Sequence, residues 1–532
     1  MKLEYKYQNF YDILDRNTKE NAKKTVIFTE EGKLSNEQLQ DSVDKFARFL
    51  ELSGVKYKDK VAMVLSNSEY FIIALFAITK LGAIVVPINN FLKNEELTYI
   101  INNCEAKLLV ASEEFEKELE GIRENSAITR TIWTDKKSGL DENNFCFDEV
   151  LSANNIHENM TYTPVIDDTA IIIYTSGTTG APKGAMLSYK NLFSNSIAGG
   201  ARFKLTPKDR FVVYLPMFHS FTLSIMLIAP IYYNSSIVIV KSIFPFANVL
   251  KQVLLKRVTI FLGAPQIYNA LNKAKIPWYF MLFNKIRLFV SGAAPLSEQV
   301  LIDFNNKFKK AIMIEGYGLS ECSPAVCTNL YEKRKTLSVG LPLDSYEVKI
   351  VDEELLEVKT GEVGELIVKG DCVMQGYYNM PNATDDTIIN GWLKTGDFAK
   401  VDKDGYIYIV DRKKDLIITK GINVYPREIE EQIQKINGVD ASAVVGIKNE
   451  LKDEKIVAFI QMEKDIDYTL SKSDIVKELK EHLANFKIPK DIYFIDELPK
   501  NATNKVLKRK LKENINFYVD QSNSITAKKE NI

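Results

Sequence analysis

The chain has 532 residues, of which 46% are hydrophobic and 26% charged, a composition typical of a soluble globular protein. This length exceeds what one hydrophobic core can organise, so we expect at least two domains. Lys and Arg (69) nearly balance Asp and Glu (70), and the net charge of −1 excludes an overall electrostatic attraction to nucleic acid.

The cysteines and histidines exclude an obvious zinc site. The five cysteines include no Cys-x-x-Cys pair, and His157, His219 and His482 are far apart in the sequence. We therefore expect reduced thiols in a cytoplasmic protein. The first residues, MKLEYKYQNFYDIL, are charged and lack the apolar core of an export signal.

Helix and strand patterns alternate through the first part of the chain. Ser35–Gln38 resembles a capping box that opens a helix ending at Gly54. A buried helix is predicted over Phe71–Leu81. Apolar runs typical of buried strands lie at Val61–Leu65, Ala83–Val86 and Leu108–Ala111. Apolar strands joined by helices predict an α/β fold with parallel strands.

A glycine- and hydroxyl-rich loop follows the apolar strand Ile171–Ile173. The loop Thr175–Gly184 reads TSGTTGAPKG. Glycines allow close backbone approach, hydroxyls donate to phosphate oxygens, and Lys183 adds a positive charge, so the loop predicts phosphate binding. Ala181 and Pro182 separate Gly180 from the lysine, a spacing that excludes the common P-loop.

The segment Phe211–Val240 contains no Asp, Glu, Lys or Arg. Its length would suffice for a membrane span, but Pro216, His219 and Pro230 interrupt it. We predict a buried strand, a loop, a core helix over Thr222–Tyr233 and a second buried strand. Peripheral contact with a membrane stays open at this stage.

A small α+β unit is predicted beyond the charged cluster Asp411–Asp415. A helix begins near Pro426 and ends at Gly438, and a second helix covers Ser473–Asn485. Strand patterns occupy Ala443–Ile447, Ile456–Gln461 and Ile492–Ile495. We divide the chain into domains 1–412 and 413–515, followed by a polar tail, 516–532, that we expect to be disordered.

The loop Thr175–Gly184 resembles the signature of the adenylate-forming superfamily, which includes acyl-CoA synthetases. Further segments resemble that family's motifs in its order: Ser291–Leu296, Tyr317–Glu321, Trp392–Asp397 and Leu498–Val506. Ser320 stands where the family usually has Thr, and Asn504 where it commonly has Gly. The resemblance implies a large N-terminal domain of several subdomains, with layered sheets and helices, and a small mobile C-terminal domain.

The resemblance also assigns roles to residues. It implies catalytic roles for Lys505, His219, Glu321 and Thr179, with Glu321 also holding Mg²⁺. The positions that it implies for binding ATP or CoA are Thr175, Ser176, Gly177, Thr178, Thr179, Gly180, Lys183, Gly292, Ala293, Ala294, Gly316, Tyr317, Gly318, Ser320, Asp397, Arg412, Lys414 and Gly421. Asp397 would bind the ribose hydroxyls, and Lys414 would be the hinge between the domains. Without the resemblance, the basic run from Lys505 to Lys512 reads as a solvated helix face.

The resemblance implies that ATP converts a carboxylic acid to acyl-AMP, which then acylates CoA. The uncharged lining near His219 favours a fatty acid or another hydrophobic acid over an amino acid. Transfer to acyl carrier protein, an aryl-CoA ligase and a non-catalytic binding module are the alternatives. We expect a monomer or homodimer.

Overall fold

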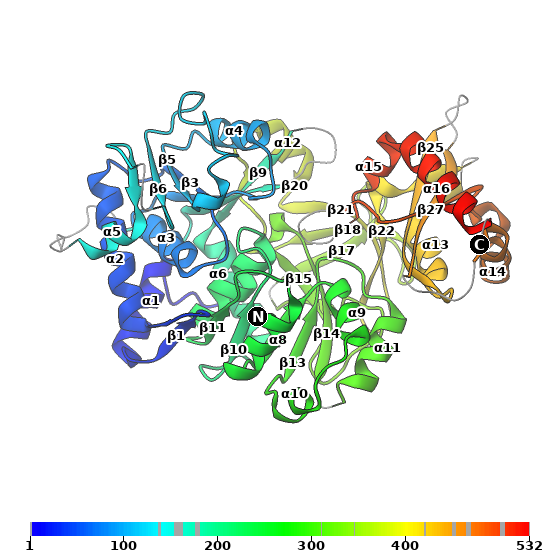
Figure 1. The fold of residues 1–532 in the computed structure, drawn as a ribbon, viewed down its shortest axis with the longest axis horizontal. Coiled ribbons are helices and arrows are strands. Elements are labelled where there is room, and N and C mark those ends of the chain that lie inside the picture. The colour runs from blue at the N-terminus through cyan, green and yellow to red at the C-terminus, as the bar shows by residue number, and fades with distance from the viewer. Residues whose placement is uncertain are drawn as a thin grey trace.

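The computed structural model describes residues 3–136, 140–153, 163–175, 181–309, 311–344, 346–419, 422–448, 454–463, 470–500 and 506–530. It has a large domain built on three sheets and a smaller C-terminal domain, separated at the right of Figure 1. The predicted α/β fold with a small C-terminal unit is therefore confirmed.

A nine-stranded sheet forms one half of the large domain. Its strands, in spatial order, are β16 (Leu341–Pro342), β15 (Ala325–Thr328), β14 (Ile312–Gly318), β13 (Leu288–Ser291), β12 (Ile260–Gly263), β10 (Arg210–Val213), β11 (Ser236–Ile239), β1 (Thr25–Phe28) and β2 (Lys33–Ser35). The run from β14 to β1 is parallel throughout. The carboxyl ends of these six strands therefore meet at one edge of the sheet, and their amino ends meet at the other.

An eight-stranded sheet forms the other half. Its strands are β19 (Gly376–Tyr377), β9 (Lys183–Ser188), β8 (Thr169–Thr175), β4 (Ile84–Pro87), β3 (Lys60–Val64), β5 (Leu108–Ala111), β6 (Arg130–Trp133) and β7 (Asn144–Cys146). The run from β8 to β7 is parallel, whereas β8 and β9 form an antiparallel hairpin. The predicted phosphate loop joins these two hairpin strands.

Helices between and outside the two sheets bury the apolar side chains. Helix α3 (Glu69–Lys80) is buried on every side over Phe71–Thr79, because it lies in the core that both sheets share. Helix α2 (Asn36–Leu52) begins at the predicted capping box, in which Ser35 and Gln38 each bond the other's backbone N–H. The remaining helices of this domain are α1 (Phe10–Asn21), α4 (Asn94–Asn103), α5 (Phe147–Ser152), α6 (Tyr189–Arg202), α7 (Ala229–Tyr232), α8 (Phe246–Leu255), α9 (Pro265–Lys273), α10 (Trp278–Phe283), α11 (Glu298–Lys307) and α12 (Pro381–Thr387).

The uncharged segment Phe211–Val240 folds as buried elements. It contains most of β10, then η2 (Thr222–Ile228), then α7 and β11. The predicted core helix is present, but its first part, η2, has the wider π-helical form, in which Ala229 N donates to Ser224 O. Among the described helices, none combines the length and the apolar character that crossing a membrane requires.

A five-stranded sheet connects the two halves to the C-terminal domain. It consists of β17 (Glu347–Val351), β18 (Gly364–Lys369), β20 (Ile388–Ile389), β21 (Trp392–Val401) and β22 (Ile407–Arg412). The C-terminal domain contains β23 (Ile417–Thr419), β24 (Ile422–Val424), α13 (Pro426–Ile433), β25 (Val439–Lys448), β26 (Glu454–Met462), α14 (Lys472–His482), β27 (Asp491–Ile495), α15 (Lys508–Glu513) and α16 (Ile515–Glu530).

The C-terminal tail differs from the sequence expectation. Residues 516–530 belong to helix α16 rather than to a disordered segment. Ser522 is fully buried, and its hydroxyl oxygen accepts a hydrogen bond of 3.0 Å from Phe494 N in β27. Ile525 packs against the core of this domain. The polar composition misled the prediction, because a few well-placed side chains anchor an otherwise polar helix.

Candidate functional site

The two ends of the predicted phosphate loop lie side by side. Thr175 ends β8 and Lys183 begins β9, and these residues are cross-strand partners in the hairpin. Positions Ser176, Gly177, Thr178, Thr179 and Gly180 lie outside the described residues. The Lys183 ammonium lies 5.1 Å from the centre of the Tyr377 ring, within the range of a cation–π contact. The mouth of the hairpin therefore carries a cation.

Glu321 joins the nine-stranded half of the domain to this hairpin. It lies in η3 (Ser320–Cys322), directly after β14. Its Oε1 accepts hydrogen bonds from Thr175 Oγ1 at 3.3 Å and from the Tyr377 hydroxyl at 3.1 Å. A carboxylate beside hydroxyl groups is a suitable donor set for Mg²⁺, which prefers oxygen ligands. Glu321 thus fits the metal role that the sequence assigns to it.

Tyr377 is a site residue that the sequence analysis missed. It lies in the two-residue strand β19, which pairs with β9 on the far side of the hairpin. Burial and the neighbouring Glu321 carboxylate raise the pKa of its hydroxyl, which keeps the hydroxyl protonated as a donor. No motif in the sequence marks this residue, because its role depends on a pairing between distant strands.

A second cluster forms around Asp397 in β21. The Tyr317 hydroxyl donates a short hydrogen bond to Asp397, and Arg412 Nε lies 3.8 Å from Asp397 Oδ1. Arg412 is the cross-strand partner of Asp397 in β22. Burial raises the pKa of Asp397, and Arg412 partly opposes that shift. The structure therefore brings together three residues to which the resemblance assigns a role in binding ATP or CoA.

Backbone packing at the carboxyl edge of the nine-stranded sheet leaves little room for side chains. Gly292 follows β13, and a methyl group on it would lie 3.2 Å from the Phe221 ring. A methyl group on Gly318 would lie 2.0 Å from the carbonyl oxygen of Pro324, so only glycine fits there. Gly316 lies between them in β14. Ala293 has a left-handed backbone (φ 67°) and is exposed, a strained conformation of the kind found at binding sites. Ala294 follows it at the same edge.

His219 lies beside this edge, in the loop that follows β10. Asn67 fixes the loop, because its Nδ2 donates to Leu215 O and its Oδ1 accepts from Met217 N. Ser220 Oγ lies 2.8 Å from Ser320 Oγ, which ties the loop to the residue before Glu321. Burial lowers the pKa of His219 to about 4, so the imidazole is neutral at physiological pH. Its Nδ1 accepts from Phe221 N at 3.3 Å.

The charged cluster Asp411–Asp415 connects the two domains. Lys413 pairs with Glu365 of the five-stranded sheet at 2.8 Å, and Asp411 Oδ2 accepts from Arg427 N of α13. Burial and the nearby Arg412 lower the pKa of Lys414, the predicted hinge residue. Gly421 and Lys505 lie outside the described residues. The hinge position is thus surrounded by contacts to both domains.

The basic run near Lys505 does not form a wholly solvated face. Lys508 opens α15 with its side chain mostly buried, and it pairs with Glu430 of α13 at 2.8 Å. Burial alone would lower its pKa, but Glu430, Asp411 and Asp415 raise it above the ordinary value. The prediction of a solvated helix face was therefore wrong for Lys508. Its acidic partners lie about 80 to 100 residues away in the sequence, so the local pattern of basic residues could not reveal them.

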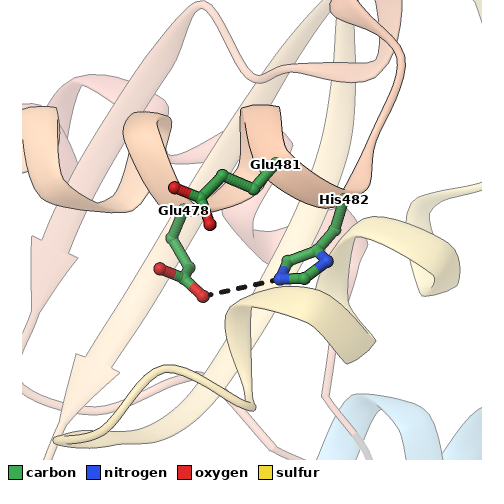
Figure 2. Close-up of side chains that lie close together, drawn as sticks. All are labelled: Glu478, Glu481 and His482. Atoms are coloured by element: carbon green, nitrogen blue, oxygen red, sulfur yellow. Dashed lines mark ion pairs between the residues drawn. The ribbon is translucent and has the colours of Figure 1, made fainter.

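Outside this region, one exposed cluster on α14 has the composition of a metal site. Glu478, Glu481 and His482 share one helix face, with His482 Nε2 3.6 Å from Glu478 Oε1 (Figure 2). All three side chains are exposed, and residues spaced three and four apart on a helix meet in this way without an ion. The cluster is unrelated to the predicted site.

Comparisons with known proteins identify the family of the chain. Residues 14–378 match the family model for AMP-binding enzymes, and residues 428–505 match the model for their C-terminal domain. A long-chain-fatty-acid–CoA ligase of Escherichia coli O6:H1 is 32% identical over 97% of this chain and 96% of its own. A 2-succinylbenzoate–CoA ligase of a Geobacillus strain is 32% identical over 92% of this chain and 94% of its own.

A solved structure shows the same fold. The anthranilate CoA ligase AuaEII in complex with anthranoyl-AMP superposes with a TM-score of 0.87 at 29% identity, covering 96% of this chain and 98% of its own. The chain therefore belongs to the family of AMP-binding enzymes.

Proposed function

We propose that this protein is an acid–CoA ligase that activates a fatty acid with ATP. The first step would give acyl-AMP and pyrophosphate, and the second would transfer the acyl group to the thiol of CoA. The observation that carries the proposal is the bond between Ser220 and Ser320. It places the uncharged segment Phe211–Val240 next to Glu321 and the loop end at Thr175.

The electrostatic problem of the first step is the approach of two anions. A carboxylic acid with a pKa near 4 is ionised at neutral pH and needs no general base, but the triphosphate repels it. Lys183 and Lys505, together with backbone N–H groups of the loop, would offset this repulsion, as in other phosphate chemistry. A Mg²⁺ ion held by Glu321 would neutralise further phosphate charge.

His219 is suited to hold the acid. A neutral imidazole carries one proton, and Nδ1 already accepts from Phe221 N, so the proton lies on Nε2. The Nε2–H group can donate to the carboxylate of the acid. Because the pKa of His219 is about 4, this donor stays in the same protonation state from pH 6 to pH 8.

The class of acid is inferred from the uncharged segment that the Ser220–Ser320 bond places beside Glu321. No charged side chain occurs between Phe211 and Val240, so this segment offers no cation to a second carboxylate such as that of 2-succinylbenzoate. Each methylene buried in an apolar lining adds about 0.8 kcal/mol to binding, which favours a long alkyl chain. An aryl acid is the second candidate, because the chain also resembles the anthranilate CoA ligase.

The acceptor is a free thiol rather than a cysteine of the chain. All five cysteines are buried, and burial raises the pKa of Cys104 to about 12. An internal thioester would need an accessible thiolate. We propose CoA as the acceptor. The alternative is acyl carrier protein, and an assay of acyl transfer to each of the two thiols distinguishes them.

The test is acid-dependent exchange of labelled pyrophosphate into ATP, run with saturated fatty acids of increasing chain length, benzoate and anthranilate. We expect exchange that increases with chain length over the shorter fatty acids. Faster exchange with benzoate or anthranilate would show that the substrate is an aryl acid and not a fatty acid. No exchange with any acid would overturn the enzymatic proposal.

A further inference from the structure

One stretch of the chain carries positive charge without any acidic residue. Residues 210–297 contain no Asp or Glu, although the whole protein has a net charge of −1. The basic residues of this stretch are Arg210, Lys241, Lys251, Lys256, Arg257, Lys273, Lys275, Lys285 and Arg287. The fold decides whether these charges gather on one surface.

The fold places several basic residues along the amino edge, defined as the edge of the nine-stranded sheet where its parallel strands begin. One exposed Lys or Arg lies within three residues of the start of five of these strands. They are Lys23 before β1, Lys208 before β10, Arg257 before β12, Lys285 before β13 and Lys309 before β14. Lys24 Nζ donates to Pro207 O at 2.7 Å, which shows that neighbouring loops of this edge are in contact.

Two acidic residues near this edge are paired with cations, whereas the exposed Glu37 lies beside Lys23, since Glu37 N donates to Ala22 O at 3.0 Å. Asp209 forms a bond of 2.8 Å with Arg287, which lies at the start of β13. Glu332 pairs with Lys204. The five exposed cations of the amino edge therefore outweigh the charge of Glu37 and leave this edge positive.

An exposed apolar helix lies at the same edge. Helix α10 ends five residues before β13 begins, at the bottom of the view in Figure 1. Only Phe280 of its six residues is buried, and Trp278 is 74% exposed. Leu255, at the end of the adjacent helix α8, is also exposed. The exposed apolar side chains are Leu255, Trp278, Tyr279, Leu282 and Phe283.

We propose that the amino edge docks on an anionic lipid bilayer. Trp, Phe and Leu side chains that insert at the headgroup level, flanked by Lys and Arg, are the composition of surfaces that bind acidic membranes. A symmetric dimer through this edge would bring two surfaces of the same positive charge together, which is unfavourable. The docked molecule would keep the carboxyl edge, with Glu321 and Asp397, toward water.

This orientation suits the proposed function, on which the benefit of docking rests. Fatty acids partition into bilayers, whereas ATP and CoA are dissolved in water. An enzyme held on the bilayer by its amino edge stays close to the fatty acids dissolved there, while its carboxyl edge, beside which His219 and Glu321 lie, faces the water that holds ATP and CoA.

The experiment measures flotation of the full-length protein with vesicles and without substrate, so its outcome is separable from that of the proposed function. The vesicles contain phosphatidylcholine alone or mixed with phosphatidylglycerol. We expect flotation only with the anionic vesicles, weakening as salt screens the charges. Equal flotation with both vesicles, or none with either, would overturn the proposal.

Two pairs of variants locate the surface. Reversing Arg257 and Lys285 to Glu should lower the vesicle partition coefficient by roughly 10-fold or more, whereas Lys490→Glu in the C-terminal domain should not. Trp278→Ser should weaken binding, whereas Leu356→Ser, at a position 65% exposed on another surface, should not. Unchanged binding in the amino-edge variants would contradict the proposal.

Tryptophan fluorescence gives a second readout. Trp278 is exposed, whereas Trp133 is only 6% exposed and Trp392 is partly buried. Anionic vesicles should shift the wild-type emission to shorter wavelength, and Trp278→Ser should abolish the shift. If Trp278→Ser instead converts a dimer to a monomer in sedimentation, the edge is a contact between copies and lipid docking is wrong.

Discussion

The two edges of the nine-stranded sheet use polar residues in opposite ways. At the carboxyl edge, Tyr317, Ser320 and Glu321 find partners that lie far away in the sequence, at Asp397, Ser220 and Tyr377. At the amino edge, five exposed cations project beside strand starts. A site for a specific ligand needs side chains whose positions are fixed by tertiary contacts. A surface proposed to dock on a bilayer needs only positive charge and exposed apolar area.

The largest expected effect is that of Lys505→Ala on formation of acyl-AMP. Removing one cation aimed at developing phosphate charge should lower pyrophosphate exchange by about 10³-fold. Transfer from supplied acyl-AMP to CoA should be largely retained. Lys285→Ala, at the amino edge, is the control and should leave both half-reactions unchanged with dissolved substrates. Equal loss of both half-reactions in Lys505→Ala would contradict a role confined to adenylation.

A smaller effect is expected at the adenosine end of the carboxyl edge. Asp397→Asn should raise the KM for ATP by roughly 10- to 100-fold, because a charged hydrogen bond to a hydroxyl contributes about 1.5–3 kcal/mol. Tyr317→Phe removes the phenolic hydroxyl that donates to Asp397 and retains the ring, so it should raise the KM less. Steady-state kinetics with ATP varied would decide, and an unchanged KM in Asp397→Asn would remove Asp397 from the nucleotide site.

Mutation of His219 should change the KM for the acid, whereas the titration of His219 should not affect the wild-type pH profile. His219→Ala removes the proposed donor to the carboxylate and should raise the KM for the acid about 10-fold. Since the pKa of His219 is about 4, below its ordinary 6.5, the wild-type kcat/KM for the acid should show no step due to this group between pH 6 and pH 8. A step near pH 6.5 that disappears in His219→Ala would contradict the neutral assignment.

The smallest effect concerns stability rather than activity. Glu315, the residue before Gly316, is buried, and burial raises its pKa to about 7 from the ordinary 4.5. The folded state therefore binds this proton more tightly, and the resulting stability is complete below pH 4.5 and lost as pH rises through 7, by up to about 3 kcal/mol. The melting temperature of Glu315→Gln relative to wild type should be higher at pH 8 than at pH 5. The same difference at both pH values would contradict a protonated Glu315.

The same contrast explains what the sequence could predict. The helix begun by Ser35 and the strand Leu108–Ala111 follow from local capping and apolar runs, and the structure has both. The pairing of Lys508 with Glu430 and the contact of Tyr377 with Glu321 depend on packing between distant segments, which no local pattern encodes. The roles of Gly421 and Lys505 stay predictions.

The central claim is that the mouth of the β8–β9 hairpin and the carboxyl edge of the nine-stranded sheet together hold ATP. A crystal structure with a non-hydrolysable ATP analogue and Mg²⁺ tests it most directly. We predict phosphates beside Thr175 and Lys183, the metal on Glu321, the adenine near Tyr317 and the ribose at Asp397. A nucleotide bound at any other surface of the protein would contradict the claim.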